Sequence, residues 1–180
     1  MAVSVFDSQI FSELFPTGDI GRLFTDNAEI RAMMLVEGKL ARIQGKHGCI
    51  PQESAEAIHR AAMELQVDPS ELAKSTGENG VNVPGLVASF QKHMQAPEHA
   101  QYVHFGATSQ DIIDTGLMLR LRQMLSLQEE LLRTVLEQLA ELAQEYAELP
   151  MVARTYGQAA ALSSFGATVA TWGNPLVDLL

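Results

Sequence analysis

A helical pattern runs from near Ser109 or Asp111 to about Glu148, where Leu149-Pro150 ends it. Its apolar side chains recur at helical spacing on more than one side, so more than one face of the helix must be covered. At about 1.5 Å per residue, such a helix spans roughly 55 to 60 Å, which is longer than a domain of this size is wide. It therefore needs long neighbouring helices, supplied by the same chain or by other subunits.

The rest of the chain also carries helix signatures and no convincing strand alternation, so we predict an all-α fold. One helix follows Asp26, and a second is expected over about 52–65. A short turn is expected at 70–74, then a Gly- and Asn-rich loop at 77–85, in which Pro84 suits the first turn of another helix.

The C-terminal part contains 23 residues without a charge, between Arg154 and Asp178. That length is sufficient for a membrane span, but several polar residues and Pro175 interrupt it. We therefore expect a helix buried inside a larger bundle and no membrane span. Because the sequence ends on the apolar run NPLVDLL, we expect the chain to be truncated or to continue in a part not present here.

The charge balance restricts the partners of this chain. Its 180 residues carry a formal net charge of −10, and no basic patch is present that would neutralise nucleic acid or an anionic membrane. An anionic substrate must therefore be bound by local donors in a pocket. The lone Cys49 allows no intrachain disulfide, and the N-terminus is a poor signal peptide, so we expect a soluble, cytoplasmic protein.

The stretch HFGATSQDIIDTG, residues 104–116, places many polar groups at the start of the long helix. A helix N-terminus attracts carboxylates and phosphates through its unpaired N–H groups and its partial positive charge. Thr108 and Ser109 add hydroxyl donors there. His104 can donate to an anion or transfer a proton, and Gln110 can orient a carboxylate. The alternative is structural: Ser109 or Asp111 caps the helix, and His104 is a loop residue with satisfied hydrogen bonds.

Two further polar stretches are interpreted as loops that open helices. In ARTYGQAAALSSFG, residues 153–166, the candidates are Arg154, Thr155 and Gln158, and in GVNVPG the candidate is Asn82. The alternatives are a capped helix of small residues and a plain connector. No metal site is expected, because the histidines lack ligand-like spacing, and no nucleotide- or cofactor-binding motif is present.

Together these segments resemble a known family. HFGATSQDIIDTGLMLRLR resembles the first signature region of the fumarase/aspartase superfamily, which contains helical lyases and cycloisomerases. The run FTDNAEIRAMMLVEGKLARIQGKHGCIP, the VNVPGLV segment and ARTYGQ occur in the expected order, so the resemblance covers essentially the whole chain. GATSQD followed by DTG is most similar to the 3-carboxy-cis,cis-muconate cycloisomerases, and adenylosuccinate lyases share the His-x-Gly-x-Thr-Ser pattern.

The resemblance implies an N-terminal helical domain, residues 1–108, followed by the start of a long-helix bundle, residues 109–180. It also implies a homotetramer whose active sites are each shared by three subunits, and a third signature region beyond residue 180. The substrate would be a small polycarboxylate. The candidate site residues are His104, Ser109, Thr155 and Gln158 for catalysis, and Thr108, Gln110, Asp111, Arg154 and Asn82 for substrate binding.

The second signature region departs from the common pattern. That region commonly reads Thr-His-x-Gln, and this chain has Tyr156 at the His position. The cycloisomerases replace that His by an aromatic residue, so Tyr156 favours a cycloisomerase over a lyase. They often place a His and a Pro where this chain has Ala159 and Leu162, so no residue is assigned as the proton carrier.

The resemblance thus implies reversible lactonisation of 3-carboxy-cis,cis-muconate to a carboxymuconolactone, a step of protocatechuate breakdown in the beta-ketoadipate pathway. Donors at helix starts would stabilise the developing aci-carboxylate, so no metal or organic cofactor is expected. Two alternatives stay open: an adenylosuccinate lyase or another eliminating member of the superfamily, and a non-catalytic helical assembly fragment.

Overall fold

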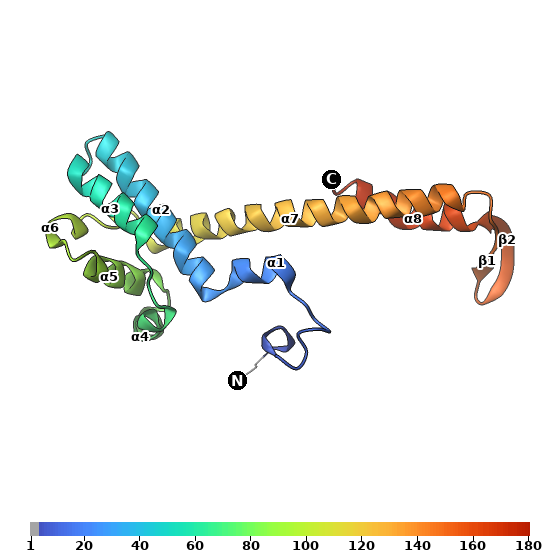
Figure 1. Ribbon diagram of the computed structural model, residues 1–180, viewed down its shortest axis with the longest axis horizontal. Helices are drawn as coiled ribbons and strands as arrows, with labels where there is room; N and C mark the ends of the chain where they lie inside the picture. The colour runs from blue at the N-terminus through green and yellow to red at the C-terminus, as the bar shows by residue number, and fades with distance from the viewer. Residues whose placement is uncertain (1–3) are drawn as a thin grey trace. The chain divides into compact units, whose positions relative to one another are not determined.

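The computed structural model describes residues 4–180, and the first three residues of the predicted N-terminal domain lie outside that range (Figure 1). The chain divides into two compact units, one extending to Met124 and the other covering Leu125–Leu180. The domain boundary predicted after residue 108 stays a prediction.

The first unit is helical. Its elements are η1 (Val5–Asp7), α1 (Gly18–Gly21), η2 (Arg22–Phe24), α2 (Asp26–Lys46), α3 (Gln52–Glu64), α4 (Pro69–Asn79), α5 (Val83–Met94), α6 (Pro97–Ala100) and the first part of α7 (Ser109–Glu145). Thr25 caps α2, because its hydroxyl accepts a hydrogen bond from the Ala28 N–H at 3.2 Å. The buried face of α2 contributes Ile30, Met33, Met34 and Ala41 to the core of the unit.

Helices α2 and α3 run side by side at close range (Figure 1). Gly38 makes the approach possible, since a Cβ atom on it would lie 2.6 Å from the Cβ of Ala62. Arg31 of α2 also holds the end of α3: its guanidinium donates to the carbonyl oxygens of Ala62 at 2.6 Å and Met63 at 3.0 Å. Those carbonyls would otherwise lack helical partners.

Helix α4 is longer than the short turn predicted at 70–74, and the predicted loop at 77–85 is reduced to residues 80–82. Asp68 caps the helix by accepting from the Ser70 N–H at 2.8 Å, and Pro69 occupies the first turn. The helix ends at Gly80, which has a φ of +74°. Residues 75–79 are polar and do not by themselves indicate a helix. The helix is indicated by the residues at its two ends.

The long helix α7 begins at Ser109, as predicted, and ends at Glu145, three residues before the predicted end. In the first unit it buries Ile112, Gly116 and Arg120. Helix α7 lies close to α2 at Gly116, where a Cβ atom would be 3.4 Å from Met33, which is van der Waals contact. The start of α7 is therefore fixed against the core of the first unit.

The second unit corrects one prediction. It contains the rest of α7, β1 (Pro150–Thr155), β2 (Gln158–Ser164) and α8 (Phe165–Val177). The predicted helix directly after residue 157 is wrong, because β1 and β2 form an antiparallel hairpin that pairs Thr155 with Gln158 and Pro150 with Ser164 (Figure 1). Tyr156 and Gly157 have φ values of +47° and +78°, which suit a tight two-residue turn between strands. The predicted, mostly helical fold is otherwise confirmed.

Helix α8 packs on the last turns of α7. Ser164 caps α8 by accepting from the Ala167 N–H at 3.1 Å, and the ring of Phe165 packs edge-on against Tyr146 at 5.5 Å between centroids. Gly166 lies against the backbone of α7 with no space for a side chain. The uncharged segment is thus divided between β2 and this 13-residue helix. Within residues 4–180, no helix combines the length and the apolar character that a bilayer crossing requires.

Candidate active site

The predicted site around residue 104 lies in the loop between α6 and α7. A series of turns leads from Ala100 to Val103. His104 and Gly106 then adopt left-handed backbone conformations, with φ values of +64° and +66°. A left-handed conformation is unusual for a residue with a side chain, so the surroundings of His104 must hold it there.

Glu37 of α2 holds the imidazole. Its Oε1 lies 2.7 Å from Nδ1 of His104, whose side chain keeps 20% of its exposure, while the Glu37 side chain keeps 1%. Burial raises the pKa of Glu37 above its ordinary value of 4.5, and the hydrogen bond and charge of His104 offset part of that rise. The structure therefore places an acid–imidazole pair at the candidate site.

A second residue of α2 holds the backbone of the same loop. The side-chain amide of Gln44 donates to the carbonyl oxygen of Phe105 at 2.6 Å. Glu37 and Gln44 are seven residues apart, which places them on one face of α2. Two adjacent loop residues are thus held by two side chains of one helix.

At the start of α7, some polar side chains already make hydrogen bonds within the chain and others do not. Asp111, the third residue of α7, accepts from the Thr108 N–H at 2.9 Å, which is one half of a capping box. The amide of Gln110 donates to Asp114 at 2.6 Å. The hydroxyls of Thr108 and Ser109 make no hydrogen bond to any residue in the described range 4–180. These hydroxyls are the free donors at a helix N-terminus, where anions are favoured.

Asn82 lies in a different cluster of the first unit. Its amide donates to Oε1 of Glu29 at 2.6 Å, and NH2 of Arg120 lies 3.3 Å from Oε2 of the same carboxylate. The guanidinium of Arg120 also lies 5.7 Å from the ring centroid of Phe24. This cluster joins α2, α5 and α7, so Asn82 has a structural role in addition to the role proposed for it.

The other predicted residues lie on the hairpin of the second unit. Arg154 and Thr155 are in β1 and Gln158 begins β2, and all three are exposed. NH1 of Arg154 lies 3.5 Å from the carbonyl oxygen of Gly157, and the Tyr156 side chain is fully exposed. These residues do not open a helix, so a helix dipole cannot assist them. Their meeting with residues 104–111 around one ligand stays a prediction.

The model of a family described as lyase matches residues 17–177. The chain belongs to the fumarase/aspartase superfamily of lyases. The resemblance of its sequence motifs to that superfamily is confirmed, and the largely helical fold agrees with solved structures of its members.

Several lyase-superfamily relatives match at similar identity. The N-acetyl-S-(2-succino)cysteine lyase of Enterococcus italicus and the 3-carboxy-cis,cis-muconate cycloisomerase of Pseudomonas aeruginosa are each 33% identical, over 96% of this chain and 37% of the relative. The adenylosuccinate lyase of Pyrococcus abyssi is 31% identical over the same shares. The crystal structure of the Acinetobacter calcoaceticus beta-carboxy-cis,cis-muconate cycloisomerase matches with a TM-score of 0.88 and 32% identity, over 94% of this chain and 40% of that one. This chain thus spans about two fifths of the length of these relatives.

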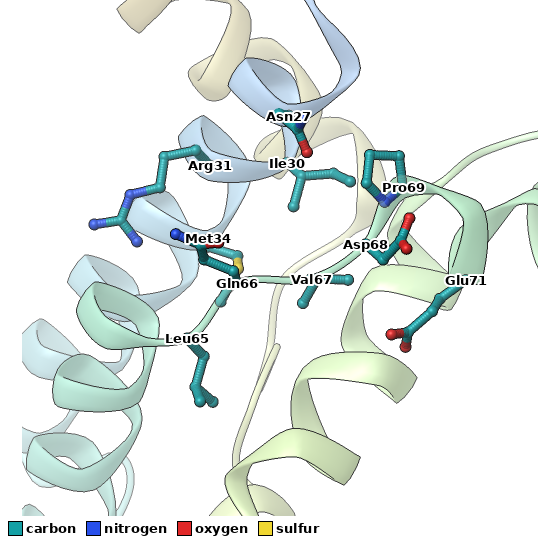
Figure 2. Close-up of a pocket in the computed structure, with 10 residues that line it drawn as sticks. All are labelled: Asn27, Ile30, Arg31, Met34, Leu65, Gln66, Val67, Asp68, Pro69 and Glu71. Atoms are coloured by element: carbon teal, nitrogen blue, oxygen red, sulfur yellow. The ribbon is translucent and has the colours of Figure 1, made fainter.

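A cleft of about 700 Å³ in the first unit contains none of the predicted site residues (Figure 2). It lies between α2 and α4 and is lined by Arg31, Asp68 and Glu71, among others. The guanidinium of Arg31 is bound to the end of α3, and Asp68 caps α4. Glu71 accepts a hydrogen bond from Ser89. Because these charged groups already serve the fold, we do not assign the cleft as the substrate site.

No group of three or more His, Cys, Asp or Glu side chains within residues 4–180 is arranged to hold a metal ion. The residues that sequence reasoning missed are Glu37 and Gln44, together with Glu29 and Arg120. One signal for Glu37 was present: an acidic residue shares the helix face of Met33 and Ala41, where apolar residues are otherwise found. An acid on such a face needs a partner from elsewhere in the fold.

Proposed function

We propose that this chain provides the first part of the substrate site of an enzyme that reversibly lactonises 3-carboxy-cis,cis-muconate. The observation that supports this most directly is the loop held by Glu37 and Gln44, which presents His104 next to the free hydroxyls of Thr108 and Ser109. Hydroxyl and imidazole groups at a helix N-terminus suit a substrate with several carboxylates. Local donors are necessary, since the chain itself carries a formal net charge of −10.

The proposed reaction is an isomerisation. One substrate carboxylate oxygen adds across a conjugated double bond. A C–O bond forms at one carbon, the π bond is consumed, and the neighbouring carbon takes up a proton that comes from the solvent. No atom leaves the substrate. Negative charge develops on another carboxyl group as an aci-carboxylate, and fixed hydrogen-bond donors stabilise that charge. We place Ser109 and Thr108 at this carboxyl group, with Thr155 and Gln158 contributing from the hairpin.

The residue that favours lactonisation over elimination is Tyr156. Eliminating members of the superfamily commonly have a proton-transferring His at that position, and this chain has an aromatic residue instead. The 33% identity to N-acetyl-S-(2-succino)cysteine lyase supports a second candidate, which is the release of fumarate from a succinylated thiol. Release of fumarate from adenylosuccinate is a third possibility, supported by the 31% identity to an adenylosuccinate lyase.

An assembly is part of this proposal. A site shared between subunits requires a homo-oligomer, which we propose to be a tetramer. A chain that stays monomeric would instead support the non-catalytic alternative, because a monomer cannot assemble a composite site.

The test is a set of three assays on a purified protein that contains this chain. Loss of the ultraviolet absorbance of 3-carboxy-cis,cis-muconate reports cyclisation, because cyclisation removes conjugation. Fumarate release from N-acetyl-S-(2-succino)cysteine and from adenylosuccinate reports the two eliminations. We expect activity in the first assay. Fumarate release without cyclisation would replace the proposed reaction by an elimination, and no turnover in any assay would favour the non-catalytic alternative.

A further inference from the structure

The α2 carboxylate of Glu37 is in surroundings that an ionised group rarely occupies. Its side chain is 1% exposed and shares a helix face with Met33, Met34 and Ala41, which are buried and apolar. Burial of a charge without a partner is strongly unfavourable. Since an uncharged residue of similar size would fill the same space, core packing alone does not explain a carboxylate here.

The partner of Glu37 is a single residue. Oε1 accepts from Nδ1 of His104 at 2.7 Å, whereas Oε2 is buried and has no partner among residues 4–180. His104 is also the titratable group that acts on Glu37 from the elements packed against it. A carboxylate only accepts hydrogen bonds, so Nδ1 carries the proton between them.

The backbone of His104 supports the same conclusion. Its φ of +64° is unfavourable for a residue with a Cβ atom, and the neighbouring Phe105 is held by Gln44. Both the ring and the main chain are therefore fixed by α2. With Nδ1 committed to Glu37, Nε2 is the ring nitrogen left for a ligand, and it makes no hydrogen bond within residues 4–180.

We propose that Glu37 is a positioning residue that keeps a proton on Nδ1 of His104 and turns Nε2 toward a carboxylate of the substrate. The identity of the ligand in this inference rests on the proposed function. The effect of Glu37 on the ring of His104 does not depend on that function. A ring that carries protons on both nitrogens presents an Nε2–H donor, which is the group that an anion requires.

The chain offers a matched control. Glu71 forms a similar acid–histidine pair, with its Oε1 3.5 Å from Nε2 of His93, and it contains no candidate site residue. Glu71→Gln therefore makes the same chemical change as Glu37→Gln in the same unit. Neither variant removes much volume, so both are expected to fold.

The first measurement is ¹⁵N NMR of the histidine rings, because ¹⁵N shifts report which ring nitrogens carry protons. We expect His104 of the unmodified chain to have a protonated Nδ1. In Glu37→Gln we expect a mixture of ring forms at His104 with His93 unchanged, and in Glu71→Gln the reverse. A His104 spectrum that is unaffected by Glu37→Gln would overturn the proposal. So would a neutral ring protonated only on Nε2 in the unmodified chain, a measurement that needs no variant.

The second measurement is binding of tricarballylate, a tricarboxylate that cannot cyclise. We expect tricarballylate to shift the His104 Nε2 signal, and Glu37→Gln to weaken binding about tenfold, with Glu71→Gln unchanged. Equal binding by the chain and by Glu37→Gln would contradict the positioning role. Failure of the proposed reaction has a different outcome: the His104 signals and tricarballylate binding respond as expected, but 3-carboxy-cis,cis-muconate is not cyclised.

Discussion

At the scale of single residues, Glu37 has opposing effects on folding and on the proposed function. Its ionised carboxylate is disfavoured by the apolar surroundings, yet that same carboxylate holds the imidazole of His104. If Glu37 served only the fold, replacing it by an uncharged residue of similar size would increase the stability of the chain. Stability and ligand binding should therefore respond in opposite directions when Glu37 is changed.

The first prediction concerns the pH dependence of stability. Because the pKa of Glu37 is raised, the folded chain binds this proton more tightly than the unfolded chain does. The contribution of Glu37 to stability therefore falls as the pH rises from its ordinary pKa of 4.5 through the raised value. Glu37→Gln removes that titration, so we expect the Tm of the variant relative to the unmodified chain to increase across this window.

Thermal unfolding followed by circular dichroism from about pH 4 to about pH 8 measures this difference. Glu71→Gln is the control, with a smaller expected change. A Tm difference for Glu37→Gln that does not vary with pH would contradict the prediction.

The second prediction concerns Ser109. Its hydroxyl makes no hydrogen bond within residues 4–180, so Ser109→Ala should change the free energy of unfolding by less than about 1 kcal/mol. If the hydroxyl donates to charge that develops in the reaction, turnover should fall about 10²- to 10³-fold. Thr134→Ala removes a hydroxyl that bonds only to the Glu130 carbonyl further along α7, and it is the control for turnover. Unchanged kinetics in Ser109→Ala would remove Ser109 from the proposed site.

The sequence identified some of these residues and not others for a physical reason. His104, Thr108 and Ser109 are contiguous, and the start of a helix can be located from local signals. Glu37 and Gln44 reach the same loop from 67 and 61 residues away in the chain. Such contacts depend on how helices pack, which residue spacing does not determine. The acidic residue on an apolar helix face was the only local indication.

At the scale of secondary-structure elements, length and periodicity decided what was predictable. Helix α7 has 37 residues, so its pattern repeats many times. The strands β1 and β2 have six and seven residues and are mostly exposed, so they lack the alternation of a strand with one buried face. The usable signal was Tyr156-Gly157, because a residue that favours positive φ marks a tight turn.

The third prediction tests this turn. Gly157 has a φ of +78°, which disfavours residues with a branched Cβ. Gly157→Val should therefore open the hairpin locally, and Gly157→Asn should have a smaller effect because Asn tolerates this conformation. Amide hydrogen exchange should show lost protection at residues 150–164 in the Val variant, with α2 and α3 unchanged. Retained protection in the Val variant would show that the turn does not determine the hairpin.

The fourth prediction concerns the packing of α2 against α3. A Cβ atom on Gly38 would lie 2.6 Å from Ala62 and 3.3 Å from Nδ1 of His59, so Gly38→Ala should force the helices apart and destabilise the fold by about 1–3 kcal/mol. Gly77 lies inside α4 with nothing within 4 Å, so Gly77→Ala should stabilise by up to about 1 kcal/mol through helix propensity alone. Urea unfolding of both variants measures the two changes. A stabilising Gly38→Ala would mean that the two helices are less closely packed than described.

At the scale of the whole molecule, the main feature is apolar surface that the chain does not cover. Large side chains along α7 and α8 are exposed, among them Leu125 at 58%, Leu131 at 62% and Trp172 at 55%. The sequence predicted this need for partners, because α7 has apolar residues on more than one side. The identity of the partner was implied only by the family resemblance.

The fifth prediction follows from that surface. We expect the 19.6-kDa chain to associate with itself, which sedimentation velocity would show as a species larger than the monomer. Leu131→Glu places a charge on the exposed apolar face and should shift the distribution toward monomer. Gln138→Glu adds a charge to an exposed polar position of the same helix and should not. Equal sedimentation of the two variants would exclude Leu131 from the contact.

Two side chains of α2 hold the loop at 104–105, so the number of residues between them in α2 matters. Each added residue turns a helix by about 100°, so a one-residue insertion between Glu37 and Gln44 would rotate one of the two side chains away from the loop. The helix itself would still form, and the loop sequence would be intact. An insertion in α2 would thus disrupt the loop at 104–105, although the sequence of that loop is unchanged.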